Sequence, residues 1–188
     1  MSLTVQQIAR CTGATLIRAA AWLPHLRVAM ALCDVSTPAR QAAFLAQIGH
    51  ESGGLVYTTE IWGPTAAQRR YEGRRDLGNV QPGDGSRFRG HGLIQVTGRA
   101  NHAAARDRLR VRLVDVAVPD FEAQPELLAQ PRWAALSAAD FWASRDLNEL
   151  ADAGNFADIT RRINGGLNGY GDRLAKWEAG KAALGETS

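Results

Sequence analysis

The segment spanning residues 55–101 constrains the fold most, because it lacks the helical periodicity found on either side. Glycine recurs from Gly63 to Gly98, with arginine and aromatic residues between the glycines. This composition predicts a loop with at most short strands. A connection of this length without regular structure is uncommon in a compact domain and is usually functional. We therefore expect a site along it.

The residues before this segment predict helices. Thr4 and Gln7 have the spacing of a capping box, for a helix that ends at Thr12 and Gly13. Residues 14–33 carry alanine and leucine at helical spacing, and we expect Pro24 to split them into two helices.

The next helix has signals at both ends. Thr37 suits the N-cap, and Pro38 suits the first helical position, where its missing N–H costs nothing. Gly53 and Gly54 end the helix. Further helices are expected over 103–112, 133–146, 156–164 and 172–184, with turns and one short helix over 119–130.

Composition fits one globular domain. The 188 residues are 45% hydrophobic and 22% charged, which supports one core and excludes disorder, collagen and coiled coil. A net charge of +3 is too small to imply nucleic acid. Cys11 and Cys33 are expected to be reduced, since one optional pair is no disulfide framework. We expect one mainly α domain over 1–188, without a separate wall-binding module.

Targeting signals are also missing from the sequence. No run of eighteen apolar residues occurs, so no membrane span is expected. The N-terminus lacks a basic region followed by an apolar run, so we expect no secretory signal and a chain made inside the cell.

Glu51 is the first candidate for catalysis. At 100° per residue it shares a helix face with the apolar Phe44 and Ile48. Desolvation there would raise the carboxyl pKa, as a general acid requires near neutral pH. The alternative is that Glu51 lies in a frayed last turn and reaches water.

Glu60 is the second carboxylate of interest. On a continuous helix it would lie on the face opposite Glu51, but the Gly53–Gly54 break lets the chain fold back. An inverting glycosidase needs two carboxyls about 6.5 to 9.5 Å apart. The spacing permits this geometry, although a lone glutamate is more commonly exposed on a strand.

Two further stretches carry polar side chains. Residues 90–101 alternate apolar and polar positions between glycines, which predicts a short strand beside a ligand. Gln95, Thr97 and Asn101 would then offer hydrogen bonds to a sugar or a water, or serve only turns and caps. Asn164 before a glycine pair is ordinarily a C-cap residue.

Together the motifs resemble glycoside hydrolase family 19, and most closely its bacteriophage and prophage endolysin branch. The resemblance covers nearly the whole chain. It is carried by four motifs in order, His50–Gly54, Glu60–Thr65, Arg89–Asn101 and Arg162–Gly166, together with the Tyr71–Gly73 and Asn79–Gly85 stretches.

The resemblance implies a lysozyme-like, α-rich fold in which the loop-rich insertion lines a substrate cleft. It implies inverting hydrolysis of a β-1,4 amino-sugar polymer, with no metal and no cofactor. Glu51 matches the general acid and Glu60 the general base. Thr97 stands where plant chitinases of the family carry a serine that holds the nucleophilic water. The substrate-binding positions implied are Gln95, Asn101, Asn164, Tyr71 and Arg162.

The departures from plant members favour an endolysin. Plant members are secreted and disulfide-bonded, whereas this sequence shows no signal and two cysteines. We therefore expect hydrolysis of peptidoglycan glycan strands, with chitin as the alternative substrate. The expected protein is a monomer that binds neither nucleic acid nor a membrane stably. It would stay in the host bacterial cytoplasm until a holin lets it reach the wall.

Two other classes compete. His50, His91 and His102 suggest a zinc hydrolase, but no pair or cluster has ligand spacing. A non-catalytic wall- or nucleic-acid-binding module would use arginines with interleaved aromatics. Its residues would be Arg69, Arg70, Arg74, Arg75, Arg87 and Arg89 with Tyr71 and Phe88.

Overall fold

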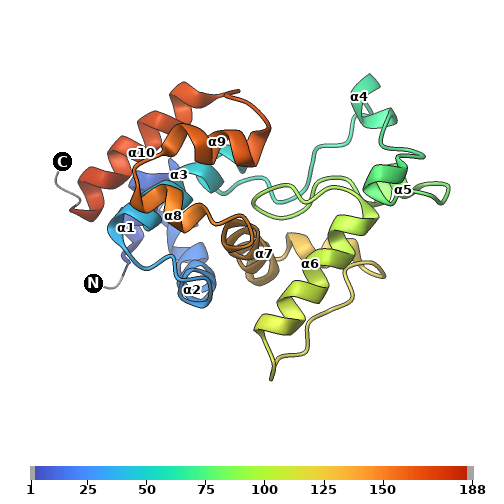
Figure 1. The fold of residues 1–188 in the computed structure, drawn as a ribbon, viewed down its shortest axis with the longest axis horizontal. Helices are drawn as coiled ribbons and strands as arrows, with labels where there is room; N and C mark the ends of the chain where they lie inside the picture. Colours follow the sequence, from blue (N-terminus) through green and yellow to red (C-terminus); the bar gives the residue numbers. More distant parts are fainter. Residues whose placement is uncertain (1–2, 186–188) are drawn as a thin grey trace. The chain divides into compact units, whose positions relative to one another are not determined.

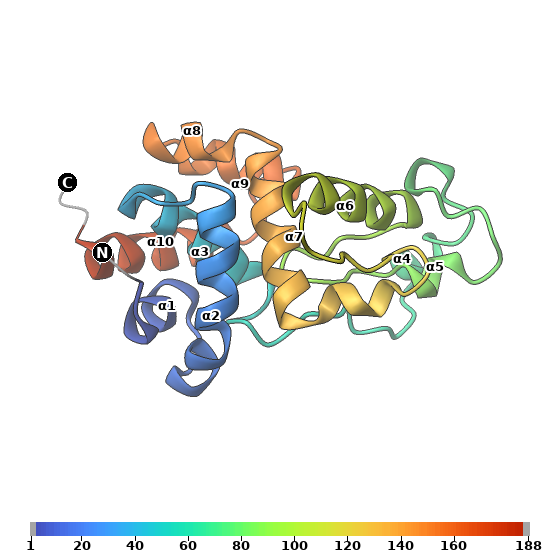
Figure 2. The same ribbon diagram turned by 90° about the horizontal axis from the view of Figure 1, so that it is seen from below.

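The protein is mainly helical, as predicted. The computed structural model describes residues 3–185, and 61% of the chain is helix. Within those residues there are isolated β-bridges but no sheet. The chain divides into two compact units (Figures 1 and 2). The first unit combines the described residues up to Val56 with those from Ala139 onward, and the second is Tyr57–Ala138.

The first unit is built around α3. Its helices are α1 (Val5–Thr12), α2 (Leu16–Leu32), α3 (Pro38–Glu51), α8 (Leu147–Asp152), α9 (Phe156–Asn164) and α10 (Tyr170–Leu184). Helices α1, α8 and α10 pack against α3, and α2 packs against α1 (Figure 2). In the core the Phe44 and Trp142 rings meet edge to face at 5.4 Å, and Phe156 stacks on Trp177 at 4.5 Å.

The predicted caps of α1 and α3 are confirmed. Thr4 and Gln7 form the capping box of α1, and Gly13 ends that helix in the left-handed region. Thr37 caps α3, with Pro38 at its start. After Ser52 the chain passes through three left-handed residues, Gly53, Gly54 and the non-glycine Leu55. The sharp turn expected after Glu51 is therefore present.

The expected division of α2 at Pro24 is wrong, because the helix is continuous from Leu16 to Leu32. An interior proline removes one backbone hydrogen bond and costs about 3 kcal/mol. Burial of Trp22, Leu26 and Met30 on the same helix offsets this cost. Pro24 itself is exposed.

The second unit contains the glycine-rich segment and differs from expectation. It holds α4 (Ala66–Arg69), η1 (Arg75–Leu77), α5 (Asp84–Arg87), α6 (Arg99–Arg112) and η2 (Pro125–Ala129). Helix α7 (Pro131–Ala143) begins in this unit and ends in the first. The segment thus forms short helical turns, and the predicted strand over 90–101 is reduced to bridges at His91 with Thr59 and Val96.

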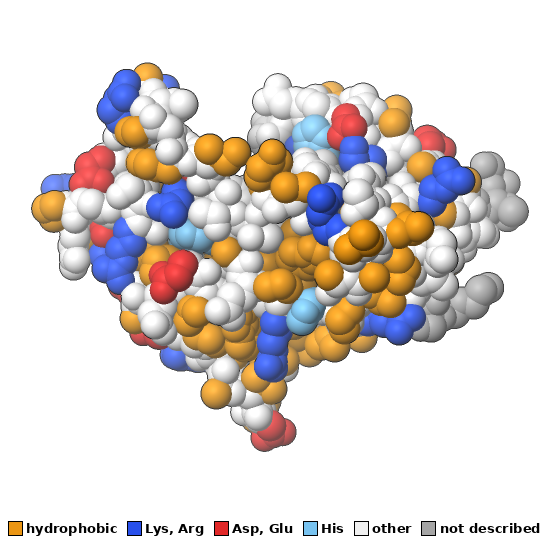
Figure 3. All heavy atoms as spheres, turned by 180° about the vertical axis from the view of Figure 1, so that it is seen from behind, with side chains coloured by type: hydrophobic (Ala, Val, Ile, Leu, Met, Phe, Trp, Pro, Cys, Tyr) orange, Lys and Arg blue, Asp and Glu red, His pale blue; other side chains and the backbone are white. Residues whose placement is uncertain are grey.

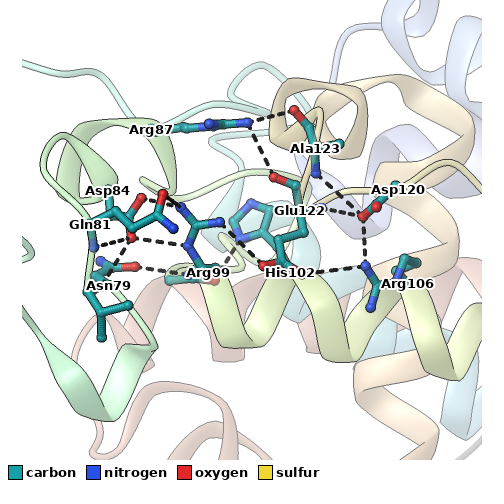
Figure 4. Close-up of polar contacts among 12 residues, drawn as sticks. Asn79, Gln81, Asp84, Arg87, Arg99, His102, Arg106, Asp120, Glu122 and Ala123 are labelled. Atoms are coloured by element: carbon teal, nitrogen blue, oxygen red, sulfur yellow. Dashed lines mark hydrogen bonds and ion pairs between the residues drawn. The ribbon is translucent and has the colours of Figure 1, made fainter.

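Helix α6 starts four residues earlier than predicted, because a distant residue caps it. The Arg99 backbone N–H donates to Asn79 Oδ1 at 3.0 Å. The Arg99 guanidinium binds both carboxylate oxygens of Asp84 and reaches Gln81 and Glu122 (Figure 4). Hydrogen bonds from Arg99 hold the pKa of Asp84 below its usual range. This network ties residues 79–84 to the start of α6.

Two further expectations concern cysteines and membranes. Cys11 and Cys33 are both buried and form no disulfide with each other, and burial raises the pKa of Cys11 to about 12. Among residues 3–185 no helix has the length and apolar character to cross a membrane.

Candidate active site

Glu51 ends α3 in the first unit, next to a buried arginine. The Arg173 guanidinium donates to Glu51 Oε1 at 2.5 Å. The Arg173 side chain is 2% exposed and that of Glu51 is 21% exposed. The Glu51 side chain is thus partly buried and held in a direct ion pair, which the periodicity did not indicate.

Arg173 belongs to a line of buried polar side chains. Its Nη1 donates to Gln47 Oε1 at 2.5 Å, and Gln47 Nε2 donates to Thr160 Oγ1 at 2.8 Å. The Thr160 hydroxyl donates to the Phe156 carbonyl at 3.1 Å. Each donor therefore meets an acceptor, as burial requires. This line of hydrogen bonds orients Arg173, and Arg173 in turn orients the Glu51 carboxylate.

His50, the neighbour of Glu51, pairs with α10 as well. Its Nδ1 lies 2.7 Å from Asp172 Oδ2, and Lys176 lies 2.5 Å from Asp172 Oδ1. Hydrogen bonds from Lys176 and His50 lower the pKa of Asp172. These contacts fix the end of α3 against the start of α10.

Of the other predicted residues in the first unit, Asn164 shares a hydrogen-bond partner with Arg173, and Arg162 does not. Asn164 Nδ2 donates weakly to the Asn168 carbonyl at 3.4 Å, and Arg173 Nε donates to that same carbonyl. Asn164 thus shares a backbone partner with the arginine that binds Glu51. Arg162 instead donates to the Arg145 carbonyl at 2.8 Å.

Glu60 lies in the second unit, held through both carboxylate oxygens. Oε1 accepts from Gln68 Nε2 at 2.9 Å, and Oε2 accepts from the Gly90 N–H at 2.9 Å. The Glu60 N–H in turn donates to the Gly90 carbonyl at 2.8 Å. A carboxylate offers about four lone-pair sites, so these bonds orient Glu60 and leave it able to accept a proton.

Tyr71 contacts Glu60, and Trp62 lies beside Tyr71. Burial and the nearby Glu60 carboxylate raise the pKa of Tyr71, and a hydrogen bond to Glu60 contributes to the rise. The Trp62 and Tyr71 rings lie 6.2 Å apart at 39°. Tyr71, predicted only to bind substrate, therefore also contacts Glu60.

The remaining predicted residues of this unit are linked to one another by hydrogen bonds. Gln95 has φ +55° and donates from Nε2 to the Gly92 carbonyl. The Thr97 hydroxyl donates to the Gln95 carbonyl at 3.1 Å, and Asn101 Nδ2 donates to the Thr97 carbonyl at 2.7 Å. A Cβ at Gly90 would lie 2.6 Å from Gln95 Oε1, so glycine permits this close approach.

Three residues of the site were not predicted from the sequence. Arg173 approaches Glu51 only through the packing of α10 on α3, which no local pattern reveals, whereas Gln47 lies four residues before Glu51 on α3 itself. Gln68 had a readable signal, since Thr65 and Gln68 have capping-box spacing and do cap α4. That signal predicts a cap without predicting the additional hydrogen bond from Gln68 to Glu60.

The structure also bears on the two competing interpretations, a zinc site and an arginine-rich binding module. No group of three or more His, Cys, Asp or Glu suited to a metal ion occurs within residues 3–185. Several arginines of the proposed binding module make contacts within the chain, among them Arg69 with Pro64, Arg74 with Asp76 and Arg87 with Ala123. On the face drawn in Figure 3, lysine and arginine side chains are scattered among hydrophobic ones.

Known proteins similar to this chain identify its family. No family model matches the chain. A glycosyl hydrolase family 19 domain-containing protein of Haemophilus influenzae is 34% identical over 167 residues, which cover 74% of this chain and 78% of that protein. The chain belongs to glycoside hydrolase family 19. It is therefore a glycoside hydrolase, as predicted.

Other proteins similar to this chain are plant and bacterial chitinases. An Arabidopsis thaliana endochitinase, At2g43610, is 33% identical over 125 residues, or 66% of this chain and 39% of that protein. The crystal structure of chitinase C from Streptomyces griseus aligns with 99% of this chain and 78% of that one, at TM-score 0.71 and 21% identity. A bacterial family 19 chitinase structure aligns with 98% and 96% of the two chains, at TM-score 0.73 and 22% identity. These structures confirm the predicted lysozyme-like helical fold.

Proposed function

We propose that this family 19 protein is an endolysin that hydrolyses β-1,4 glycosidic bonds of bacterial peptidoglycan by an inverting mechanism. The observation that carries the chemistry is the Glu60 carboxylate, which both Gln68 and the Gly90 N–H orient. Such a carboxylate suits a general base that activates a water. A preorganised base is what inverting hydrolysis needs on the far side of the sugar.

In this mechanism Glu51 is the general acid. It donates a proton to the leaving glycosidic oxygen as the bond to the anomeric carbon breaks. Glu60 takes a proton from the water whose oxygen forms the new bond to that carbon. Inversion requires the two carboxyl groups to be about 6.5 to 9.5 Å apart, so that the water fits between base and sugar.

Polar neighbours complete the proposed site. The Thr97 hydroxyl donates to the Gln95 carbonyl, which leaves its oxygen lone pairs to accept a hydrogen bond from the nucleophilic water. Gln95, Asn101, Asn164, Tyr71 and Arg162 would bind sugar groups along a cleft lined by the glycine-rich segment. We propose that 1–188 acts as one catalytic domain, whose ends at residues 1–2 and 186–188 lie outside the described residues.

Chitin is the second candidate substrate. The Arabidopsis and Streptomyces relatives are named chitinases, which favours a polymer of N-acetylglucosamine. Both polymers carry β-1,4 links between amino sugars, so the same acid and base would serve either. The endolysin role further proposes a monomer in the host cytoplasm that gains access to the wall through a holin, without a nucleic-acid partner or stable membrane association.

Fragment analysis distinguishes the two substrates. Purified peptidoglycan and chitin oligomers are digested in parallel, and the soluble products are identified by mass spectrometry. We expect muropeptide fragments from peptidoglycan, and a loss of about 10²- to 10⁴-fold in rate for both Glu51→Gln and Glu60→Gln. If only chitin gave products, chitin would be the substrate in place of peptidoglycan. If neither polymer gave products, the catalytic roles proposed for Glu51 and Glu60 would be contradicted.

A turbidity assay tests the endolysin role. Gram-negative cells with a permeabilised outer membrane should clear on addition of the protein, whereas intact cells should not. The matched control is Glu51→Gln, which should clear neither suspension. Rapid clearing of intact cells without a permeabilising agent would contradict dependence on a separate route to the wall.

A further inference from the structure

The proposed chemistry does not use two buried histidines of the second unit. His91 is 2% exposed and His102 is fully buried. His91 Nδ1 lies 3.0 Å from His102 Nε2, and His102 Nδ1 lies 2.8 Å from the Gly98 carbonyl. The two rings are nearly perpendicular, at 83°, with centroids 5.2 Å apart. Paired imidazoles in a protein interior require an explanation, because burying polar groups is costly.

The hydrogen-bond partners determine where the protons lie. The Gly98 carbonyl can only accept, so His102 Nδ1 carries a hydrogen. His102 Nε2 is then the acceptor of a neutral ring, and His91 Nδ1 donates to it. Burial lowers the pKa of each histidine to about 4, so both rings are neutral at neutral pH. The result is a series of two hydrogen bonds, in which His91 donates to His102 and His102 donates to the Gly98 carbonyl.

The backbone around His91 is what holds Glu60. His91 exchanges two backbone hydrogen bonds with Val96, at 3.0 and 2.8 Å. On one side of His91, Gly90 donates to the Glu60 carboxylate and accepts from the Glu60 N–H. On the other side, the Gly92 N–H donates to the Thr58 carbonyl at 2.8 Å. A displacement of His91 would therefore move a donor of the Glu60 carboxylate.

The position of His102, at the other end of this hydrogen bond, is also fixed. His102 lies on α6, one turn after Gly98, near the Arg99 network that ties this helix to Asp84 (Figure 4). The Phe88 ring meets His102 edge to face at 5.3 Å, and the Arg99 guanidinium lies over that ring. The hydrogen bond between His91 and His102 thus connects the segment that holds Glu60 to the start of α6, which several independent contacts hold in place.

We propose that His91 and His102 are positioning residues for Glu60. Their hydrogen bond fixes the 90–92 backbone, so that the Gly90 N–H and the Glu60 carboxylate keep the geometry needed to align the attacking water. This role rests on the proposed function, since it presumes that Glu60 acts on that water. A shift of about 1 Å in such a group can cost about 10²-fold in rate.

Paired substitutions separate the hydrogen bond from the packing. His91→Leu and His102→Leu remove the donor and the acceptor, whereas His91→Asn keeps a donor near the δ position and His102→Gln keeps an acceptor near the ε position. We expect the leucine variants to lose about 10- to 100-fold in kcat with KM within about twofold, and the amide variants to stay within about threefold of wild type. His25→Leu on α2 is the matched control and should keep full activity.

Stability is measured beside activity, by thermal unfolding of every variant. A merely structural pair would lower the melting temperature and leave kcat of the folded protein unchanged, which would overturn the positioning role. Amide variants that lose as much kcat as the leucine variants would overturn it too. If a leucine variant does not fold, methionine, which is flexible and apolar, takes its place in the same comparison.

Glu60→Gln distinguishes the two levels of inference. Wild-type kcat in Glu60→Gln would contradict the proposed function itself. Loss of activity in Glu60→Gln, together with full activity in the folded leucine or methionine variants, would contradict only the role of His91 and His102.

Discussion

At the scale of single residues, Arg173 is central to the surroundings of Glu51. Its guanidinium binds both Glu51 and Gln47 and is almost wholly buried. We predict that Arg173→Leu lowers the free energy of unfolding by about 2 to 3 kcal/mol, because it leaves the partly buried Glu51 carboxylate and the buried Gln47 oxygen without their donor. For a chain of this size each kcal/mol shifts the melting temperature by about 2 to 4 °C, which calorimetry resolves.

An exposed ion pair provides the control for Arg173. Arg161 and Asp158 pair at 2.6 Å on α9, with both side chains 54% exposed. Arg161→Leu should change stability by less than about 1 kcal/mol. The double variant Glu51→Leu/Arg173→Leu should be more stable than Arg173→Leu, since no unpaired charge remains. Equal losses of unfolding free energy in Arg161→Leu and Arg173→Leu would contradict the stabilising role of the pair between Arg173 and Glu51.

At the scale of elements, Pro24 inside α2 is a destabilising residue that the helix tolerates. It is exposed, so its replacement removes little packing. Pro24→Ala should raise the free energy of unfolding by about 1 to 3 kcal/mol, by restoring a backbone hydrogen bond. Pro38→Ala is the matched control, because Pro38 occupies the first turn of α3. Its effect on the melting temperature should be near zero, and a larger gain there than at Pro24 would contradict the explanation.

The segment around His91 and the start of α6 should make folding sensitive to acid. Both His91 and His102 have a folded pKa of about 4, below the ordinary value of 6.5. Between these values the unfolded chain binds protons that the folded chain does not, so stability falls as pH drops from about 6.5 to 4. Each histidine contributes up to about 1.4 kcal/mol per pH unit. The charge of Arg89 acts on His91 in the same direction.

Chemical denaturation at a series of pH values measures this slope. His102→Gln removes one of the two groups, so its stability should depend less steeply on pH over this interval than that of wild type. His25→Leu should keep the wild-type slope. If the unfolding free energy depended on pH equally steeply in wild type and His102→Gln, the claim that His91 and His102 are buried as neutral rings would be contradicted.

The sequence predicted those elements whose determinants are local. The caps at Thr4 and Thr37 act on residues within one turn, so their helices began where expected. The start of α6 was missed because its cap, Asn79, lies 20 residues away. The same limit explains why Glu51 and Glu60 could be selected as carboxylates while the contacts of Arg173 could not.

At the scale of the whole molecule, the two carboxylates belong to different compact units. Glu51 ends a helix of the first unit, and Glu60 lies four residues into the second. Only nine residues separate them in sequence, and the left-handed turn at Gly53–Leu55 lies between. The order of four motifs predicted the family, which the Haemophilus relative confirms. Side-chain packing at each carboxylate required the structure.

The stereochemistry of hydrolysis tests the central claim most directly, because it depends on how the two carboxylates act together. An inverting enzyme holds a water between base and sugar, whereas a retaining enzyme needs carboxyls about 5 to 5.5 Å apart and a direct attack. Proton NMR of a soluble β-1,4 oligosaccharide digest, recorded before mutarotation, reports the first anomer released. We predict that the α-anomer appears first. An initial β-anomer would contradict the roles of Glu60 as general base and Thr97 as holder of the water.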